Sequence, residues 1–355
     1  MEFKQKNFTF TKNTTNLIKG IAIIFMIVHH FLGYPEWIMY PSSYTNLGLT
    51  IDSLPIERQI ARTFCEMCVG LFLFLTGYGT YFSQDKPNYY FNSLRKLMKF
   101  LFNYWIIMFL FLIPIKLYLK DFNFDIKEII LNAFGYDNKY VKFAWYVRLY
   151  TEMIIFFPLL KKFVLEKCYI SILTSTVPFI LINMFIFKNH YQEITPINFL
   201  YEFLFRIPVM IIGYNFAKFN IFNYIKDKFI KLDLDNFFIY NFLFLIIVAL
   251  RVKLDPPSWI SFDIFYVPIL IFSIVNIIDI FKFKNINNGL IFLGKHSLNI
   301  WFLHSIFFSG SKKIQYIAYY PKNPFIIIVW VFILTIPLSF IVNVLIKIFT
   351  MKSKE

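Results

Sequence analysis

Ten stretches of the chain are apolar over the length of a membrane-spanning helix, and this pattern limits the possible fold more than any other feature. A helix needs about 20 apolar residues to cross the hydrocarbon core of a bilayer. The stretches do not alternate between apolar and polar residues, which indicates helices rather than the strands of a barrel. The expected spans are residues 17–33, 63–82, 97–119, 143–160, 169–187, 197–217, 236–252, 259–281, 289–309 and 324–349. We therefore predict an all-α integral membrane protein, a bundle of about ten transmembrane helices.

The composition agrees with a membrane protein, because 58% of the 355 residues are hydrophobic and 22% are aromatic. The net charge of +15 comes from lysines that lie mainly between the apolar stretches, where they act as topology signals rather than as a nucleic-acid surface. Positive charge is in excess on the cytoplasmic side if the N-terminus is inside, which predicts an N-in/C-in arrangement. No linker interrupts the chain, so residues 1–355 are expected to form one multi-pass domain surrounded by lipid.

The first apolar stretch carries a lysine and a histidine in the segment KGIAIIFMIVHH, at Lys19 and His30. Eleven residues separate them, which places them about 20° apart around a helix and about 16 Å apart along it. A lysine near a helix end often only extends to the membrane surface, whereas an ionisable group inside a span usually has a function. Coenzyme A fits the pair, with its phosphates near Lys19 and its thioester near His30.

Two of the six arginines lie inside apolar stretches, and each has a glutamate four residues away. Arg148 is followed by Glu152, and Arg206 is preceded by Glu202. An i, i+4 ion pair lowers the cost of holding charge in a membrane. The pairs therefore have two readings, as self-neutralised structural pairs or as parts of a functional site.

The predicted topology brings several ionisable residues to one depth in the outer half of the membrane. These residues are His30, Glu66, Arg148, Glu152, Glu202, Arg206, Asp263 and His304. Charged groups avoid lipid and turn toward the interior of a bundle. We therefore expect one polar layer that lines a hydrated pocket open to the outside.

Three segments resemble the membrane-bound acyltransferase 3 family, whose members move acyl groups from acyl-CoA to hydroxyls, often on cell-envelope glycans. KGIAIIFMIVHH is similar to the family's first helix, in which arginine, ten residues and histidine follow one another, with Lys19 replacing the arginine. CVGLFLFLTGYG resembles a family segment in which many members have a carboxylate at the position of Gly70, and Glu66 lies one turn earlier. FLGKHSLNIWFLH resembles a C-terminal signature, with Ser297 and His304 at matching positions.

The resemblance implies an enzyme that transfers an acyl group, most simply acetyl, from cytoplasmic acyl-CoA to a saccharide hydroxyl. Arg95 and Lys96, in SLRKLMKFLFNYW, match the basic loop where the phosphates of coenzyme A arrive, and a plain topology signal is the competing reading. Acyl-CoA is expected as a cosubstrate, with no bound cofactor and no metal. The expected location is the cytoplasmic membrane of a bacterium, and the expected acceptor is an envelope glycan.

His30 is the expected general base, with a covalent acyl-histidine as an open variant. Glu66 is the candidate carboxylate partner of His30, and Arg148 with Glu152 is expected to stabilise the oxyanion or to hold the glycan. The remaining expected donor- or acceptor-binding residues are Lys19, Arg95, Lys96, Glu202, Arg206, Ser297 and His304. The alternatives are a multi-pass transporter or flippase that uses the polar layer as a path, and a scaffold without catalysis.

Overall fold

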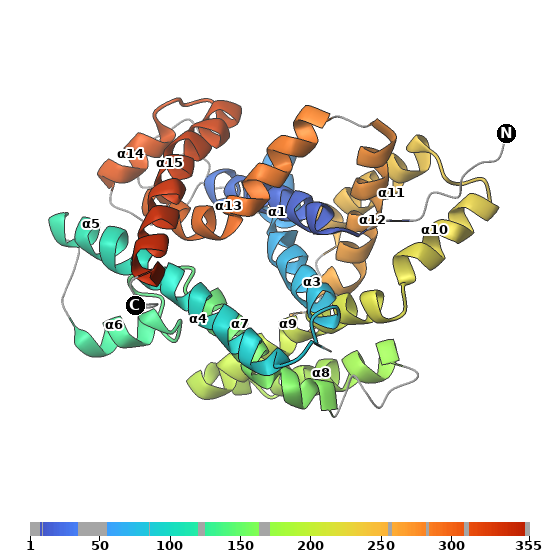
Figure 1. Cartoon of the computed structure of the whole chain (residues 1–355), viewed down its shortest axis with the longest axis horizontal. Helices are drawn as coiled ribbons and strands as arrows, with labels where there is room; N and C mark the ends of the chain where they lie inside the picture. Colours follow the sequence, from blue (N-terminus) through green and yellow to red (C-terminus); the bar gives the residue numbers. More distant parts are fainter. Residues whose placement is uncertain are drawn as a thin grey trace. The chain divides into compact units, whose positions relative to one another are not determined.

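The computed structural model describes residues 8, 10–34, 55–84, 86–119, 125–162, 171–254, 258–281, 284–308 and 312–351. Within these ranges the regular secondary structure is entirely helical (Figure 1). The helices that overlap the ten predicted spans are α1 (Lys12–Leu32), α3 (Cys68–Tyr81), α4 (Tyr89–Ile107), α7 (Trp145–Leu160), α8 (Ser171–Lys188), α9 (Thr195–Lys218), α11 (Phe237–Lys253), α12 (Asp263–Phe281), α13 (Lys284–Phe308) and α15 (Pro324–Met351). The prediction of an all-helical protein is confirmed.

Six helical segments among the described residues are long and apolar enough to cross a membrane. They are Lys12–Leu32, Ile56–Tyr81, Tyr89–Tyr118, Thr195–Lys218, Asp263–Phe281 and Pro324–Ile348. The remaining overlapping helices include α7, with 16 residues, and α11, with 17 residues. The chain is therefore a membrane protein, while the number of ten spans and the cytoplasmic termini stay predictions.

Shorter helical elements join these segments. They are α2 (Ile56–Gln59), a π-helix (Ile60–Phe64) and a 3-10 turn (Cys65–Met67) before α3; a second π-helix (Met108–Leu112) and α5 (Ile113–Tyr118) after α4; and α6 (Ile126–Ala133), a 3-10 turn (Tyr191–Glu193), α10 (Ile221–Lys231) and α14 (Lys312–Tyr319). The first π-helix and 3-10 turn lie inside the helical segment Ile56–Tyr81. π-helical turns inside longer helices are frequent at functional sites.

The chain divides into two compact units, each built from segments distant in sequence. The first unit comprises Met1–Ala22, Glu66–Tyr89 and Phe156–Lys295, and the second comprises Ile23–Cys65, Tyr90–Ile155 and His296–Glu355. Helices α3, α8, α9, α10, α11 and α12 belong to the first unit, and α4, α5, α6, α14 and α15 to the second. Helices α1, α7 and α13 contribute residues to both, and the first residue of α4, Tyr89, also falls in the first unit.

Helices α3 and α9 of the first unit pack at very short range because both carry glycine at the contact. A Cβ atom on Gly77 would lie 1.8 Å from the carbonyl oxygen of Met210, and one on Gly213 would lie 2.1 Å from that of Phe74. Small residues let membrane helices approach closely, and dispersion contacts then hold them together. The same unit has an aromatic core in which the ring of Phe222 contacts those of Phe8, Phe10, Tyr78 and Phe272.

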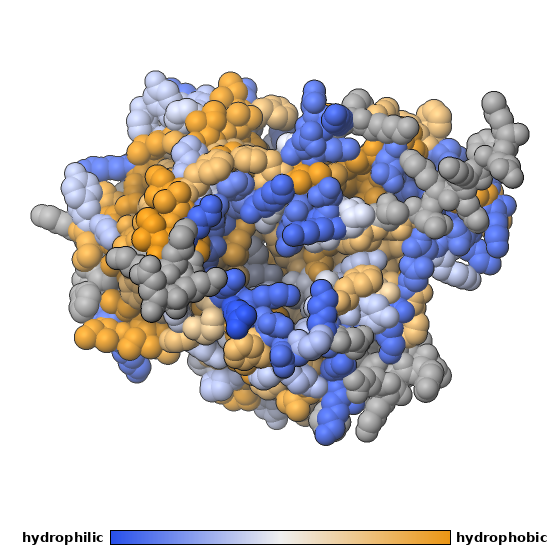
Figure 2. Space-filling view, in the orientation of Figure 1, coloured by the Kyte–Doolittle hydropathy of each residue, from blue (hydrophilic) through white to orange (hydrophobic). Residues whose placement is uncertain are grey.

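In the second unit, α15 presents one apolar side outward. Phe325, Ile326, Val329, Ile333 and Phe340 are all at least half exposed. Figure 2 shows hydrophobic residues, in orange, over the position of α15 in the same view. Exposed apolar side chains in such numbers mark a surface that another apolar phase covers, and lipid is that phase for a helix of this length.

Candidate active site

His30 and His304 form a hydrogen-bonded pair inside the second unit. Nδ1 of His30 lies 2.9 Å from Nε2 of His304, and the ring planes differ by 9°. Atoms of two rings stacked face to face stay about 3.5 Å apart. The distance of 2.9 Å between the two nitrogens is shorter, so the imidazoles meet edge to edge with nearly parallel planes. The side chains are 8% and 0% exposed. The pair joins the C-terminal end of α1 to the C-terminal part of α13.

One face of this histidine pair is covered by the ring of Phe143. Its centroid lies 4.2 Å from that of His30 and 5.3 Å from that of His304, with interplanar angles of 27° and 19°. Phe308, from the end of α13, contacts both Phe143 and His30. An aromatic cover of this kind excludes water from the imidazoles and holds their orientation.

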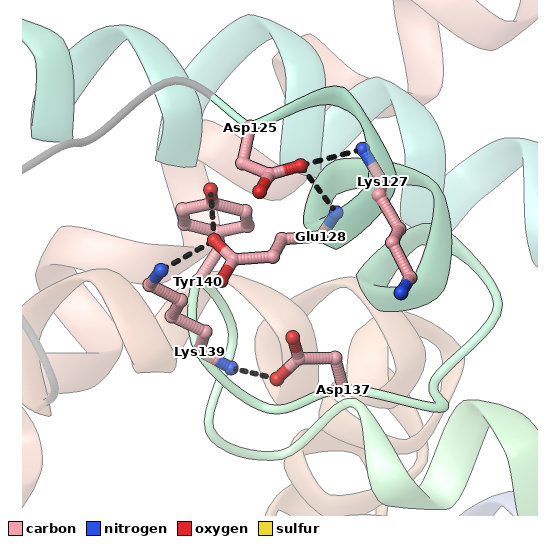
Figure 3. A network of polar contacts seen from close by, with 6 residues as sticks. All are labelled: Asp125, Lys127, Glu128, Asp137, Lys139 and Tyr140. Atoms are coloured by element: carbon pink, nitrogen blue, oxygen red, sulfur yellow. Dashed lines mark hydrogen bonds and ion pairs between the residues drawn. The ribbon is translucent and has the colours of Figure 1, made fainter.

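Phe143 is carried by the segment between α6 and α7, and a polar network fixes this segment (Figure 3). Asp125 caps α6, because its Oδ1 accepts hydrogen bonds from the backbone N–H groups of Lys127 and Glu128. The Glu128 carboxylate accepts hydrogen bonds from the Lys139 ammonium and from the Tyr140 hydroxyl. This contact with Glu128 raises the pKa of Lys139 above its ordinary value.

The same segment approaches the start of α7 through Gly135. Gly135 has φ of +80°, a conformation that favours glycine. A Cβ atom there would lie 2.4 Å from the Ala144 carbonyl oxygen and 2.6 Å from the backbone nitrogen of Arg148. The close approach helps to bury Arg148, which is 3% exposed and lies 3.5 Å from the Glu152 carboxylate. The predicted Arg148–Glu152 pair is therefore present.

His29, next to His30, has its own backbone partner. Its Nδ1 atom lies 3.2 Å from the carbonyl oxygen of Ala61. A carbonyl oxygen only accepts hydrogen bonds, so Nδ1 of His29 carries the proton when the ring is neutral. The ring of His29 also lies 5.1 Å from that of His30, centroid to centroid. Two imidazoles are thus buried side by side at the end of α1.

The first unit holds a separate charged cluster. Arg251, at the end of α11, donates a hydrogen bond to Glu66 at 3.0 Å, and its Nε lies 3.9 Å from the Asp263 carboxylate. A Cβ atom on Gly70 would lie 2.6 Å from Oδ2 of Asp263. Asp263 therefore fills the space beside Gly70, and Glu66 has an arginine as its partner. Arg206 also lies within electrostatic range of Asp263.

A family model described as an acyltransferase domain matches residues 14–344. The chain belongs to the acyltransferase 3 family. The protein is accordingly a membrane acyltransferase, as the three sequence segments suggested. Searches among curated proteins and among solved structures return no match.

The remaining expected site residues of this acyltransferase are distributed over several helices. Lys19 lies in the first half of the unbroken helix α1, and Glu202 and Arg206 lie one turn apart on α9. Arg95 and Lys96 are exposed near the start of α4, with the Arg95 guanidinium stacked on Phe91. Ser297 is buried on α13, seven residues before the histidine of the pair. The structure brings together His30 with His304 and Arg148 with Glu152, in the second unit.

Sequence reasoning missed several residues that lie at the site. His304 was expected to bind donor or acceptor, whereas it contacts His30 directly, and no carboxylate contacts His30 in the described part of the chain. Phe143 was not expected at the site, and Arg251 was not expected in the separate charged cluster of the first unit. The only sequence signal for Arg251 was its place at the edge of an apolar stretch, in a chain with very few arginines. Phe143 is one of 48 phenylalanines, so its type alone gave no signal.

Proposed function

We propose that this acyltransferase moves an acyl group, most simply acetyl, from cytoplasmic acyl-CoA to a hydroxyl of an envelope glycan, with His30 as general base. The observation that carries the proposal is the buried hydrogen bond between His30 and His304 in a member of an acyltransferase family. Ionisable groups inside membrane-spanning helices are rare and usually functional. A base within a shielded site is what transfer to a weakly acidic hydroxyl requires.

The hydrogen bond of the histidine pair allows the His30 tautomer that a general base needs. If Nδ1–H of His30 donates to Nε2 of His304, the lone pair of His30 is on its own Nε2. His304 then carries its proton on Nδ1, which is a buried atom. This arrangement supports His30 as a base, since its Nε2 is left to accept a proton and His304 positions the ring.

The proposed reaction proceeds through a tetrahedral intermediate. Nε2 of His30 takes the proton of the acceptor hydroxyl while the oxygen attacks the thioester carbonyl carbon. The carbon–sulfur bond then breaks, and the protonated His30 returns the proton to the leaving thiolate, which gives free coenzyme A and an ester. His304 accepts the hydrogen bond from the imidazolium throughout. In the variant, Nε2 itself attacks the thioester and carries the acyl group before the hydroxyl arrives.

Substrate contacts follow from the placement of charge. We assign the phosphates of coenzyme A to Lys19, Arg95 and Lys96. The developing oxyanion is assigned to Arg148, which is buried in the same unit as His30 and held by Glu152. Donors aimed at an oxyanion in a shielded site contribute roughly 2.7–4 kcal/mol each. The remaining proposed donor or acceptor contacts are Glu202, Arg206 and Ser297, and the proposed location is the cytoplasmic membrane of a bacterium.

A transfer assay with matched histidine variants tests the proposal. Purified protein in nanodiscs receives radiolabelled acetyl-CoA and a panel of envelope glycans, and label in the glycan is counted. We expect His30→Ala to lower kcat by roughly 10²- to 10⁴-fold, the usual contribution of a general base. The controls are His190→Ala, whose side chain is 76% exposed, and His296→Ala, a buried histidine on α13 that hydrogen-bonds Ser339. Both controls should keep transfer.

Two outcomes separate the competing functions. Normal transfer by His30→Ala refutes the assigned base. If the wild type transfers no label to any hydroxyl acceptor but moves labelled glycan across the membrane of sealed vesicles, the protein is a transporter rather than an enzyme. Label that stays on acid-quenched wild-type protein, and is absent from His30→Ala, identifies the acyl-histidine variant.

A further inference from the structure

Helix α14 is a short helix of the second unit that buries one side against the protein. Its eight residues follow α13 after a link of three residues, and they are too few to cross a membrane. Ile314, Gln315, Ala318 and Tyr319 are all buried. Residues one turn apart share a side of a helix, so these four positions form one buried side. Two of the four side chains on that side are polar.

Each of these two polar side chains binds a backbone carbonyl at the end of another helix. The Tyr319 hydroxyl donates a hydrogen bond to the carbonyl oxygen of Phe31 at 3.0 Å, and Nε2 of Gln315 donates one to that of Phe308 at 2.8 Å. Phe31 lies in the last turn of α1, and Phe308 is the last residue of α13. The last four carbonyl groups of a helix have no partner within that helix. Helix α14 therefore supplies a donor to the end of α1 and to the end of α13.

The two residues held in this way adjoin the histidine pair. Phe31 directly follows His30 in sequence, and Phe308 lies one turn after His304. The ring centroid of Phe308 lies 5.3 Å from that of His30, and the centroid of Phe31 lies 6.5 Å from that of His304. The Phe31 ring also contacts the rings of Phe308 and Tyr319, each at 5.7 Å. Each hydrogen bond from α14 thus acts within one turn of a histidine.

Helix α14 is in turn held by α15, beside which it lies (Figure 1). The indole nitrogen of Trp330, on α15, donates a hydrogen bond to the carbonyl oxygen of Ile317 at 2.9 Å. The hydrogen bond between His30 and His304 joins two helices distant in sequence, so it persists only while both helix ends keep their places. Groups at a reaction site must be held to within about 0.5 Å of the productive geometry. One helix that binds both ends meets this need.

We propose that α14 is a clamp that sets the separation of His30 and His304, with Gln315 and Tyr319 as positioning residues. The effect on rate rests on the proposed acyl transfer, but the hydrogen bond between the histidines does not depend on catalysis. Neither positioning residue contacts substrate in this scheme. Without one of the two bonds from α14, one helix end shifts, the contact of 2.9 Å lengthens and fewer molecules hold His30 as the base.

The hydrogen bond between the histidines is measurable by NMR on protein with ¹⁵N-labelled histidine in lipid. A scalar coupling between Nδ1 of His30 and Nε2 of His304 reports the proton that they share, and the chain has only five histidines to assign. Tyr319→Phe removes the hydroxyl and keeps the ring. We expect this variant to lose about half of the coupled population or more, because one neutral hydrogen bond shifts an equilibrium about two- to twelvefold.

Tyr214→Phe is the matched control for this measurement. Tyr214 is also a buried tyrosine, but its hydroxyl donates to Oε1 of Gln84 at 2.7 Å, in the first unit. Both substitutions remove one buried hydroxyl and lower the thermal midpoint through the lost hydrogen bond. Only Tyr319→Phe should change the coupling between the histidines.

Initial rates then test the effect on the proposed reaction. Tyr319→Phe and Gln315→Met should each lower kcat about two- to twelvefold, since each removes one neutral hydrogen bond. The KM for acetyl-CoA should stay within about twofold of the wild type, because neither side chain binds substrate. If Tyr319 acts through the pair, the double variant Tyr319→Phe/His304→Ala should be no slower than His304→Ala alone.

The outcomes separate the clamp from the proposed reaction. No coupling in the wild type, unchanged coupling in Tyr319→Phe, an equal decrease in Tyr214→Phe, or losses of kcat that multiply with His304→Ala overturn the inference. Should Gln315→Met fail to fold, Tyr319→Phe decides alone. Coupling that Tyr319→Phe weakens, together with no transfer from acetyl-CoA by the wild type, supports the clamp and refutes the acyltransfer reaction.

Discussion

Replacing His304 by alanine tests whether the histidine pair acts as a unit. In the ground state the pair is a neutral hydrogen bond, which is worth about 0.5–1.5 kcal/mol, and in the transition state His30 is charged and the bond is worth about 1.5–3 kcal/mol. Only the difference of about 1–1.5 kcal/mol slows the reaction. Since 1.36 kcal/mol corresponds to a tenfold change in rate, kcat should fall at least about five- to twelvefold. Loss of the preferred His30 tautomer would slow the reaction further.

Two isosteric variants make this test specific. The amide of glutamine reaches the position of Nε2, the atom that contacts His30, whereas the amide of asparagine reaches only that of Nδ1. His304→Gln should therefore recover most of the activity, and His304→Asn should resemble His304→Ala. Initial rates with acetyl-CoA and thermal unfolding of each variant separate an effect on catalysis from an effect on folding.

A double-mutant cycle gives the result that would refute the reasoning. If His304 acts only through His30, the double variant His30→Ala/His304→Ala should be no slower than His30→Ala alone. Independent, multiplying losses would show that His304 contacts substrate itself. An unchanged kcat in His304→Ala would show that the hydrogen bond at 2.9 Å has no part in the reaction.

Three further predictions concern packing and charge. Gly77→Ala should lower the thermal midpoint, because its Cβ would lie 1.8 Å from the Met210 carbonyl oxygen and overpacking costs about 1–3 kcal/mol. The control is Gly79→Ala on the same helix, whose Cβ would meet nothing within 4 Å and which should be neutral or stabilising. Gly135→Ala should destabilise by about 1–2 kcal/mol or more through its positive φ alone and also lower kcat, measured by unfolding and transfer on the same samples. Glu128→Gln should flatten the alkaline pH dependence of stability, because contact with Glu128 raises the pKa of Lys139. The stability that this contact adds is fully present below the ordinary lysine pKa of 10.5 and is lost as the pH rises through the raised pKa. Thermal midpoints measured across that pH range test this.

The helices were predictable from sequence because lipid selects for continuous apolar length. The expected stretch 324–349 corresponds to Pro324–Met351, and 197–217 to Thr195–Lys218. The stretch 63–82 was placed seven residues too late, since the helical segment begins at Ile56. Its first residues, IERQIAR, include three charged side chains, of which that of Arg58 is buried. A hydropathy pattern detects burial in lipid but not burial of charge in protein.

The site was predictable only where its chemistry is local. Arg148 and Glu152 are four residues apart, so helix geometry alone brought them together. His30 and His304 are 274 residues apart in sequence and form one hydrogen bond. A family signature gave the positions of both histidines, but their contact depends on how α1 and α13 pack, which no local pattern encodes. The contacts of Phe143 are non-local for the same reason.

Each of the two compact units places a largely buried arginine beside a carboxylate. In the first unit, Arg251 lies between the carboxylates of Glu66 and Asp263, so acid and base neutralise each other within the protein. In the second unit, Arg148 lies 3.5 Å from the carboxylate of Glu152, and the guanidinium of Arg62 lies over the ring of Tyr34. Loss of Asp263 or Glu152 would leave a largely buried arginine without that carboxylate, a change that typically costs about 3–5 kcal/mol.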